Sequence, residues 1–223
     1  MFDRIAPRYD LLNRVLSAGT DVRWRRLAVD WLDLAPPARV LDLCTGTADL
    51  LIEVLGRDAR HSGLGVDLSH EMLRRGAAKL KRAGGTGRGC LAGGDAESLP
   101  VAAGGFDAAL VAFGIRNVGD APRALREVHR VLRPGGRFVV LEFQEPPGLL
   151  GRLYRIYFTK ILPRLGGLIS GDRSAYTYLP ASVARFPSPG AFGSLMEEAG
   201  FVSVRWRLLT GGIACLHRGD KPS

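Results

Sequence analysis

Residues 39–49 read RVLDLCTGTAD, and this stretch decides the fold of the chain. Its first five residues, RVLDL, are a short apolar run that predicts a buried strand. The small residues at 44–48 allow a sharp turn in which the backbone can approach a ligand closely. Residues 47–56 then carry leucine and valine at helical spacing, so the stretch predicts a strand, a tight loop and a helix.

Strands and helices alternate along the rest of the chain. Further buried strands are predicted at 63–67, 106–113 and 137–143, with helices after Ser69 and over 121–132, a turn at 134–136, and at best one weak strand within 84–94. Such alternation predicts a mainly parallel sheet with right-handed crossovers. A helix near 189–199 precedes two last strands, 201–209 and 212–216, which must pair antiparallel because only a tight turn joins them.

A doubly wound α/β sheet closed by an antiparallel hairpin is the Rossmann-like arrangement of class I S-adenosylmethionine (SAM) methyltransferases. The 223 residues fit one domain. Within residues 1–223, we expect 1–35 to form a helical lid before the sheet and 145–187 to form a helical insertion or second lid.

Composition narrows the class of protein. Lys and Arg exceed Asp and Glu by nine charges, and 46% of residues are hydrophobic, as in an ordinary soluble protein. The excess favours an anionic partner, but arginines scattered along the chain do not by themselves indicate nucleic acid. The cysteines and histidines have no metal-binding spacing, and no signal peptide or spanning segment is found, so we expect a cytoplasmic, metal-free protein.

The cofactor residues are expected at the carboxyl ends of the central strands, where ligands of such sheets bind. Gly46 lies in the turn after the first strand, and Asp67 ends the second strand, where it can accept hydrogen bonds from both ribose hydroxyls. Asp95 and Ala96 follow the third strand, where an acid and a backbone amide can bind the adenine edge.

A nicotinamide dinucleotide would use similar geometry, but its site requires G-x-G-x-x-G. The corresponding positions here are Cys44, Gly46 and Ala48. Asp49 enters the first helical turn, where its charge opposes a diphosphate and suits a sulfonium and an ammonium. The alternative is that Asp42 and Asp49 are helix-capping or solvated acids.

Four sequence blocks carry a family resemblance. They are YDLLNRVLS at 9–17 with a following tryptophan, FGIRNV at 113–118, RVLRPGGRFVVLEF at 130–143, and LHRGDK at 216–221. With these blocks the chain resembles the UbiE/MenG family of quinone C-methyltransferases over almost its whole length. The resemblance implies SAM-dependent methylation of a ring carbon in a prenylated quinol, most simply demethylmenaquinol, with the ubiquinone-pathway benzoquinol, or both, as the alternative.

The resemblance also implies that SAM contacts Thr47, Asp67 and the pair Asp95 and Ala96. Three positions depart from the family pattern. Many members have serine at position 112, histidine at 21 and serine at 144, where this chain has Ala112, Asp21 and Gln144.

A quinol carbon attacks an electrophilic methyl group well only while its neighbouring hydroxyl loses a proton. We therefore interpret Arg116 as stabilising the developing phenolate and Asn117 as orienting a hydroxyl or a water. Tyr9 and Asp10 are further candidates for the base or for acceptor contact. The competing interpretation is that Arg116 pairs with Glu142 or Asp10 and holds its loop.

Residues 149–165, LLGRLYRIYFTKILPRL, combine a broad apolar helical face with four basic residues. This pattern is typical of a helix on an anionic membrane surface, with the basic side chains reaching the headgroups. A lid over the active site explains the same pattern, and both roles are compatible.

Two other classes of function compete with a quinol methyltransferase. A base-amine methyltransferase acting on nucleic acid usually has Asn/Asp-Pro-Pro-Tyr/Phe after the fourth strand, where residues 112–115 read AFGI. This disfavours a nucleic-acid substrate, although methylation of another small molecule or of RNA remains the alternative. A SAM-binding module without catalysis would bind the cofactor and turn over no quinol.

Overall fold

The computed structural model describes residues 17, 19–148, 151 and 174–223, except for the side chains of residues 174–177 and 179. These residues form a seven-stranded sheet in the order β3-β2-β1-β4-β5-β7-β6. The strands are β1 (Arg39–Leu43), β2 (Ser62–Asp67), β3 (Gly89–Gly93), β4 (Phe106–Ala112), β5 (Leu132–Phe143), β6 (Val202–Leu209) and β7 (Ala214–Asp220). The helices are α3 (Thr20–Leu32), α4 (Asp49–Leu55), α5 (His70–Arg82), α6 (Ala121–Val131), α9 (Ser174–Arg185) and α10 (Pro189–Glu198), with 3-10 turns η2 (Ile115–Asn117) and η4 (Thr210–Gly212).

Strands β1 to β5 pair in parallel, and β7 runs antiparallel between β5 and β6. This confirms the predicted class I methyltransferase sheet. All carboxyl ends of the parallel strands therefore meet at one edge of the sheet, which is where a ligand is expected.

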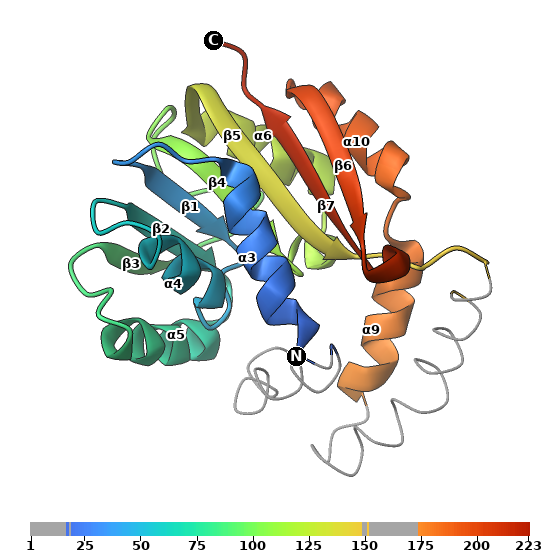
Figure 1. Ribbon diagram of the computed structural model, residues 1–223, viewed down its shortest axis with the longest axis horizontal. Helices are drawn as coiled ribbons and strands as arrows, with labels where there is room; N and C mark the ends of the chain where they lie inside the picture. The colour runs from blue at the N-terminus through green and yellow to red at the C-terminus, as the bar shows by residue number, and fades with distance from the viewer. Residues whose placement is uncertain (1–16, 18, 149–150, 152–173) are drawn as a thin grey trace.

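Helices cover both faces of the sheet (Figure 1). Helices α3 and α4 lie on one face, where Trp24 and Leu50 pack against Leu110 and Leu141. Helices α6 and α10 lie on the other face, where Phe192 belongs to another cluster of buried apolar side chains. The central strands are buried on both faces, which explains their nearly continuous apolar sequence.

The turn predicted at 134–136 is part of β5. Phe106 lies opposite Leu132, but Ala108 lies opposite Arg137, so the chain bulges out between these two registers. Gly135 has φ of 70° in the bulge, a left-handed conformation that glycine adopts without steric cost. The strand therefore begins five residues before the predicted start.

The final strand extends farther than the prediction of 212–216. It continues to Asp220 because it pairs along its whole length with β5. Its polar residue Arg218 is buried and donates hydrogen bonds to the carbonyl oxygen of Trp31 and to the Asp220 carboxylate, so a polar sequence here belongs to a buried strand. Within the described ranges, no helix is both long enough and apolar enough to cross a membrane.

Candidate active site

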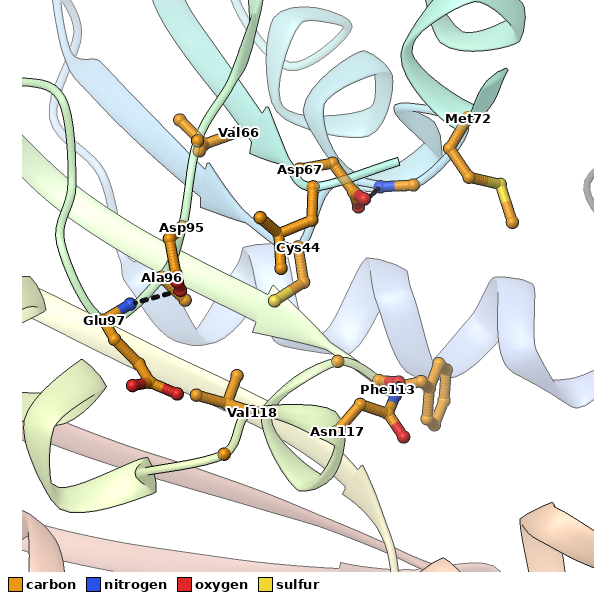
Figure 2. Close-up of a pocket in the computed structure, with 15 residues that line it drawn as sticks. Cys44, Val66, Asp67, Met72, Asp95, Ala96, Glu97, Phe113, Asn117 and Val118 are labelled. Carbon is orange, nitrogen blue, oxygen red and sulfur yellow. Dashed lines mark hydrogen bonds between the residues drawn. The ribbon is translucent and has the colours of Figure 1, made fainter. Parts of the chain in front are cut away.

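A cleft opens at the carboxyl ends of β1, β2, β3 and β4, with about 800 Å³ of empty space when its open mouth is included. Figure 2 shows that loops after all four strands contribute to it. Its lining consists of Cys44, Gly46, Val66, Asp67, Leu68, Met72, Gly94, Asp95, Ala96, Glu97, Phe113, Gly114, Asn117, Val118 and Gly119. Of the predicted cofactor residues, the cleft brings together Gly46, Asp67, Asp95 and Ala96.

The loop after β1 is held tightly against β2. The Thr45 N–H donates to the carbonyl oxygen of Val66 at 3.0 Å. A Cβ at Gly65 would lie 2.6 Å from the Thr45 hydroxyl oxygen, so a side chain at this position would push the loop out. Gly46 itself has φ of 56°, which lets the chain turn toward the cleft.

Asp67 ends β2 and connects the first two loops. One carboxylate oxygen accepts the N–H of Gly46 at 2.8 Å, and the other accepts the N–H of Ser69 at 2.8 Å. Each carboxylate oxygen has two lone pairs, so both can also accept from a ligand in the cleft. Two acceptor oxygens side by side fit the two hydroxyl donors of a ribose diol.

Asp95 and Ala96 lie on the neighbouring wall of the cleft. The Asp95 carboxylate accepts the N–H of Glu97 at 2.9 Å, which fixes its direction (Figure 2). In the described part of the chain, the N–H of Ala96 meets no hydrogen-bond acceptor. An acceptor beside a free donor matches the amino group and ring nitrogen of an adenine edge, so these residues fit a SAM nucleoside.

Thr47 and Asp49 lie outside the cleft lining. Lys79 donates to the Thr47 hydroxyl at 3.0 Å and forms an ion pair with Asp49, while Arg25 approaches the Asp49 carboxylate to 3.8 Å. The interpretation that the Asp49 charge suits a sulfonium and an ammonium stays a prediction, although this carboxylate pairs with Lys79 and lies near Arg25, which Asp21 binds more closely. The predicted contact of Thr47 with SAM stays a prediction.

Asp42 is buried beneath the cleft. Its carboxylate accepts the Thr45 hydroxyl at 2.6 Å and the N–H of Leu51 at 3.1 Å. Burial raises the pKa of Asp42 from 3.8 to about 7, with the charge of Asp67 adding to the rise. The capping alternative is thus correct for Asp42.

This raised pKa predicts a dependence of stability on pH. The folded protein binds the Asp42 proton more tightly than the unfolded chain does, so this contribution to the free energy of unfolding falls as pH rises from about 4 to about 7. The variant Asp42→Asn keeps an oxygen acceptor and cannot ionise. Thermal unfolding should show its advantage over the natural protein growing between pH 5 and pH 8, whereas a constant difference would contradict the pKa.

The far wall of the cleft is the segment from Phe113 to Asn117. Phe113 has φ of 60° and stacks on Phe143 with ring centroids 4.3 Å apart. Trp24 of α3 packs against both rings at 6.3 Å and 6.2 Å. An aromatic cluster thus joins α3 to the loop that follows β4, with η2 at its end.

Arg116 does not line the cleft, and its side chain is only 8% exposed. Its guanidinium donates to the Glu142 carboxylate at 2.7 Å and to the carbonyl oxygen of Phe113 at 2.5 Å. The Glu142 side chain is fully buried, which raises its pKa, while the Arg116 charge beside it acts in the opposite direction. The pairing of Arg116 with Glu142 is confirmed, and the cleft receives Asn117 instead. Tyr9 and Asp10 lie outside the described residues.

Several site residues were missed by sequence reasoning. Tyr178 donates a hydrogen bond to Asn117, and Ser182 accepts one from Arg116; both lie on α9, more than 60 positions away. Leu68 lines the cleft with 71% of its surface exposed, and only its position after the acid of β2 could have indicated it. Cys44 also lines the cleft; burial, followed by the charges of Asp67 and Asp42, raises the pKa of its thiol, which stays neutral.

Two of the three departures from the family pattern have hydrogen-bond partners in the described part of the chain. Asp21 is buried and accepts hydrogen bonds from Ser17 and Arg25. Gln144 is buried and donates to the carbonyl oxygen of Pro187 at 3.1 Å. Ala112 is half-buried at the end of β4 and does not line the cleft.

Comparison with known proteins agrees with this geometry. The model of the ubiE/COQ5 methyltransferase family matches residues 1–221. The chain belongs to the ubiE/COQ5 methyltransferase family. This membership confirms the predictions of a SAM-dependent methyltransferase and of its family.

Individual relatives cover all or nearly all of the chain. It is 52% identical over 223 residues to the demethylmenaquinone methyltransferase of Thermus thermophilus, with 100% of both chains covered. It is 54% identical over 220 residues to the ubiquinone/menaquinone biosynthesis C-methyltransferase UbiE of Syntrophotalea carbinolica, covering 98% of this chain and 92% of the relative. A solved structure of a SAM-dependent methyltransferase of Thermotoga maritima, a possible histamine N-methyltransferase, superposes with a TM-score of 0.68 at 22% sequence identity. The match covers 99% of this chain and 97% of the solved chain, and it supports the fold.

Proposed function

We propose that the protein transfers a methyl group from SAM to a ring carbon of demethylmenaquinol, a prenylated quinol. The observation that carries this proposal is the 52% identity to a demethylmenaquinone methyltransferase over the full length of both chains. The cleft supports it, because it offers nucleoside-binding groups on one side and a polar amide on the other. The ubiquinone-pathway benzoquinol is the second candidate, since another relative is named for both quinones.

SAM supplies an electrophilic methyl group, and the chain must bind and align it. In this proposal Asp67 accepts both ribose hydroxyls, Asp95 and Ala96 bind the adenine edge, and Gly46 lets the backbone approach the cofactor. Because Asp67 also holds the N–H groups of Gly46 and Ser69, its direction is fixed before the ligand arrives. Alignment of this kind can lower a methyl-transfer barrier by several kcal/mol.

The acceptor ring enters where Asn117 and Phe113 border the cleft, across from Val66 and Asp95 (Figure 2). Asn117 hydrogen-bonds the quinol oxygen that loses its proton, and Phe113 offers an aromatic wall to the ring. Arg116 acts by holding η2 in place through Glu142. Tyr9 and Asp10 stay candidates for the base, and Thr47 for a further cofactor contact.

Segments 1–35 and 145–187 are proposed as two lids over this cleft within a single domain. Of their described parts, Tyr178 of α9 reaches Asn117 at the cleft, whereas α3 covers one face of the sheet and its Trp24 packs on Phe113 from within the core. The lids would exclude water from the quinol as its hydroxyl deprotonates.

The acceptor is tested by competition. The protein receives labelled SAM with equal amounts of demethylmenaquinol and of a benzoquinol precursor of ubiquinone, under reducing conditions. We expect the label mainly in the menaquinol product. Label only in the benzoquinol would transfer the assignment to the ubiquinone pathway.

Contact with a membrane surface follows from the prenyl tail of this substrate. Residues 149–165, of which the structure describes only Gly151, carry the basic and apolar pattern proposed to bind anionic lipid. The protein should pellet with vesicles containing anionic lipid at low salt and be released at high salt, because the attraction is screened. Failure to pellet at low salt would remove the membrane contact and leave the lid role.

A further inference from the structure

The side chain of Asn117 is fixed at both ends of its amide. Its Nδ2 lies 3.4 Å from the carbonyl oxygen of Phe113, and its Oδ1 lies 2.9 Å from the hydroxyl of Tyr178. A backbone carbonyl can only accept, so the amide group that faces Phe113 must be the NH2. The amide oxygen therefore faces Tyr178, whose hydroxyl donates to it.

Tyr178 comes from α9, which contacts η2 at two successive turns. One turn after Tyr178, Ser182 accepts a hydrogen bond from Nε of Arg116 at 3.3 Å. Residues four apart lie on the same face of a helix, so one face of α9 holds both polar residues of η2. Val183 anchors this helix in the apolar cluster beneath, together with Trp24 and Phe113.

We propose that Tyr178 is a positioning residue that fixes the amide of Asn117 so that the cleft meets an N–H donor and not the amide oxygen. This inference rests on the proposed function, because it assigns to Asn117 the hydrogen bond to the quinol oxygen. One hydrogen of Nδ2 is used by Phe113, and in the described part of the chain the other has no acceptor. Asn117 lines the cleft, so this second N–H is the group that it offers to an acceptor (Figure 2).

The chemistry explains why the orientation matters. The quinol oxygen gains negative charge as it loses its proton, and a fixed N–H stabilises that charge, whereas an amide oxygen would repel it. An amide without a partner can rotate by 180° and exchange these two groups. Tyr178→Phe removes only the hydroxyl, so the ring packing is kept while the amide retains only its long contact of 3.4 Å with the Phe113 carbonyl and turns more easily.

The amide can be observed directly by NMR. The chain has two asparagines, Asn13 and Asn117, so selective labelling with 15N-asparagine gives two side-chain NH2 signals. The signal of Asn117 is identified by its loss in Asn117→Ala. In Tyr178→Phe we expect this signal to shift and its protons to exchange with solvent about tenfold faster, as for a lost hydrogen bond. Ser182→Ala, one turn along the same face, is the matched control and should leave the Asn117 signal in place.

Kinetics then test whether Tyr178 acts through Asn117. Tyr178→Phe should lower kcat for demethylmenaquinol about fivefold to tenfold, with the KM for SAM unchanged, as expected for one hydrogen bond. The same substitution in an Asn117→Ala background should lower kcat less than about twofold, because the group that it positions is already gone.

An unchanged Asn117 signal in Tyr178→Phe, or losses that multiply in the double variant, would overturn the inference. The NMR signal is read without any acceptor, so it decides the placing of Asn117 even if the natural protein methylates no quinol. Absence of methyl transfer by the natural protein would instead overturn the proposed function.

Discussion

Replacing Arg116 by alanine is expected to lower the free energy of unfolding by about 3–5 kcal/mol, because it leaves the Glu142 carboxylate without its cation. The Glu142 side chain is fully buried, and that of Arg116 is 8% exposed, so solvent cannot take over the pairing. The guanidinium also holds the Phe113 carbonyl and the Ser182 hydroxyl, so η2 should lose its position beside the cleft. We expect methyl transfer to fall at least about a hundredfold, measured together with chemical denaturation.

A double variant separates the effect on stability from the effect on methyl transfer. Arg116→Met combined with Glu142→Gln removes the buried charge along with its partner and should recover most of the stability. An Arg116→Ala variant as stable as the natural protein would contradict the structural role of this ion pair. Stable protein with normal SAM binding and no turnover would return Arg116 to the phenolate role predicted from sequence.

Replacing Gly114 by alanine is expected to disturb the cleft about as strongly as replacing Arg116 by alanine. A Cβ at this position would lie 2.4 Å from the Cβ of Cys44, far inside contact distance, and both atoms are attached directly to backbone. The loops after β1 and β4 must therefore separate, and both of them line the cleft. Calorimetry should show SAM affinity reduced about a hundredfold or more, since misplacement by an ångström at a binding site has effects of this order.

The geometry supplies a rescue and a control for this variant. Cys44 has φ of 52°, a conformation that glycine adopts readily, so adding Cys44→Gly removes the clash and should restore most of the affinity. Gly105→Ala would place its Cβ 3.6 Å from the carbonyl oxygen of Ala102, an ordinary contact, and should bind SAM normally. Full SAM affinity in Gly114→Ala alone would show that the two loops are not packed as described.

The sequence predicted the sheet and one side of the cleft because these features are local. Apolar runs ending in an acid marked β1 and β2, and the carboxyl ends of parallel strands meet at one edge whatever the details of packing. Asp67, Asp95 and Ala96 could thus be placed together from strand order alone. The bulge in β5 was missed because Pro and Gly at 134–136 are equally typical of a turn.

The other side of the cleft could be predicted only for Asn117, because the rest depends on contacts between distant segments. The charge of Arg116 suits a phenolate or a buried carboxylate equally well, and only the fold brings Glu142 to 2.7 Å. Tyr178 reaches Asn117 across 61 positions, and nothing in the sequence around it indicates that partner. The ion pair of Asp49 was missed for the same reason, because Lys79 approaches it from the next helix.

The most direct test of the central claim is methyl transfer from labelled SAM to a short-tailed demethylmenaquinol, in detergent and under reducing conditions. The account predicts labelled menaquinol with the methyl group on a ring carbon. Normal SAM binding without any labelled quinone would contradict it, leaving the fold and the family in place but not the quinol as the acceptor.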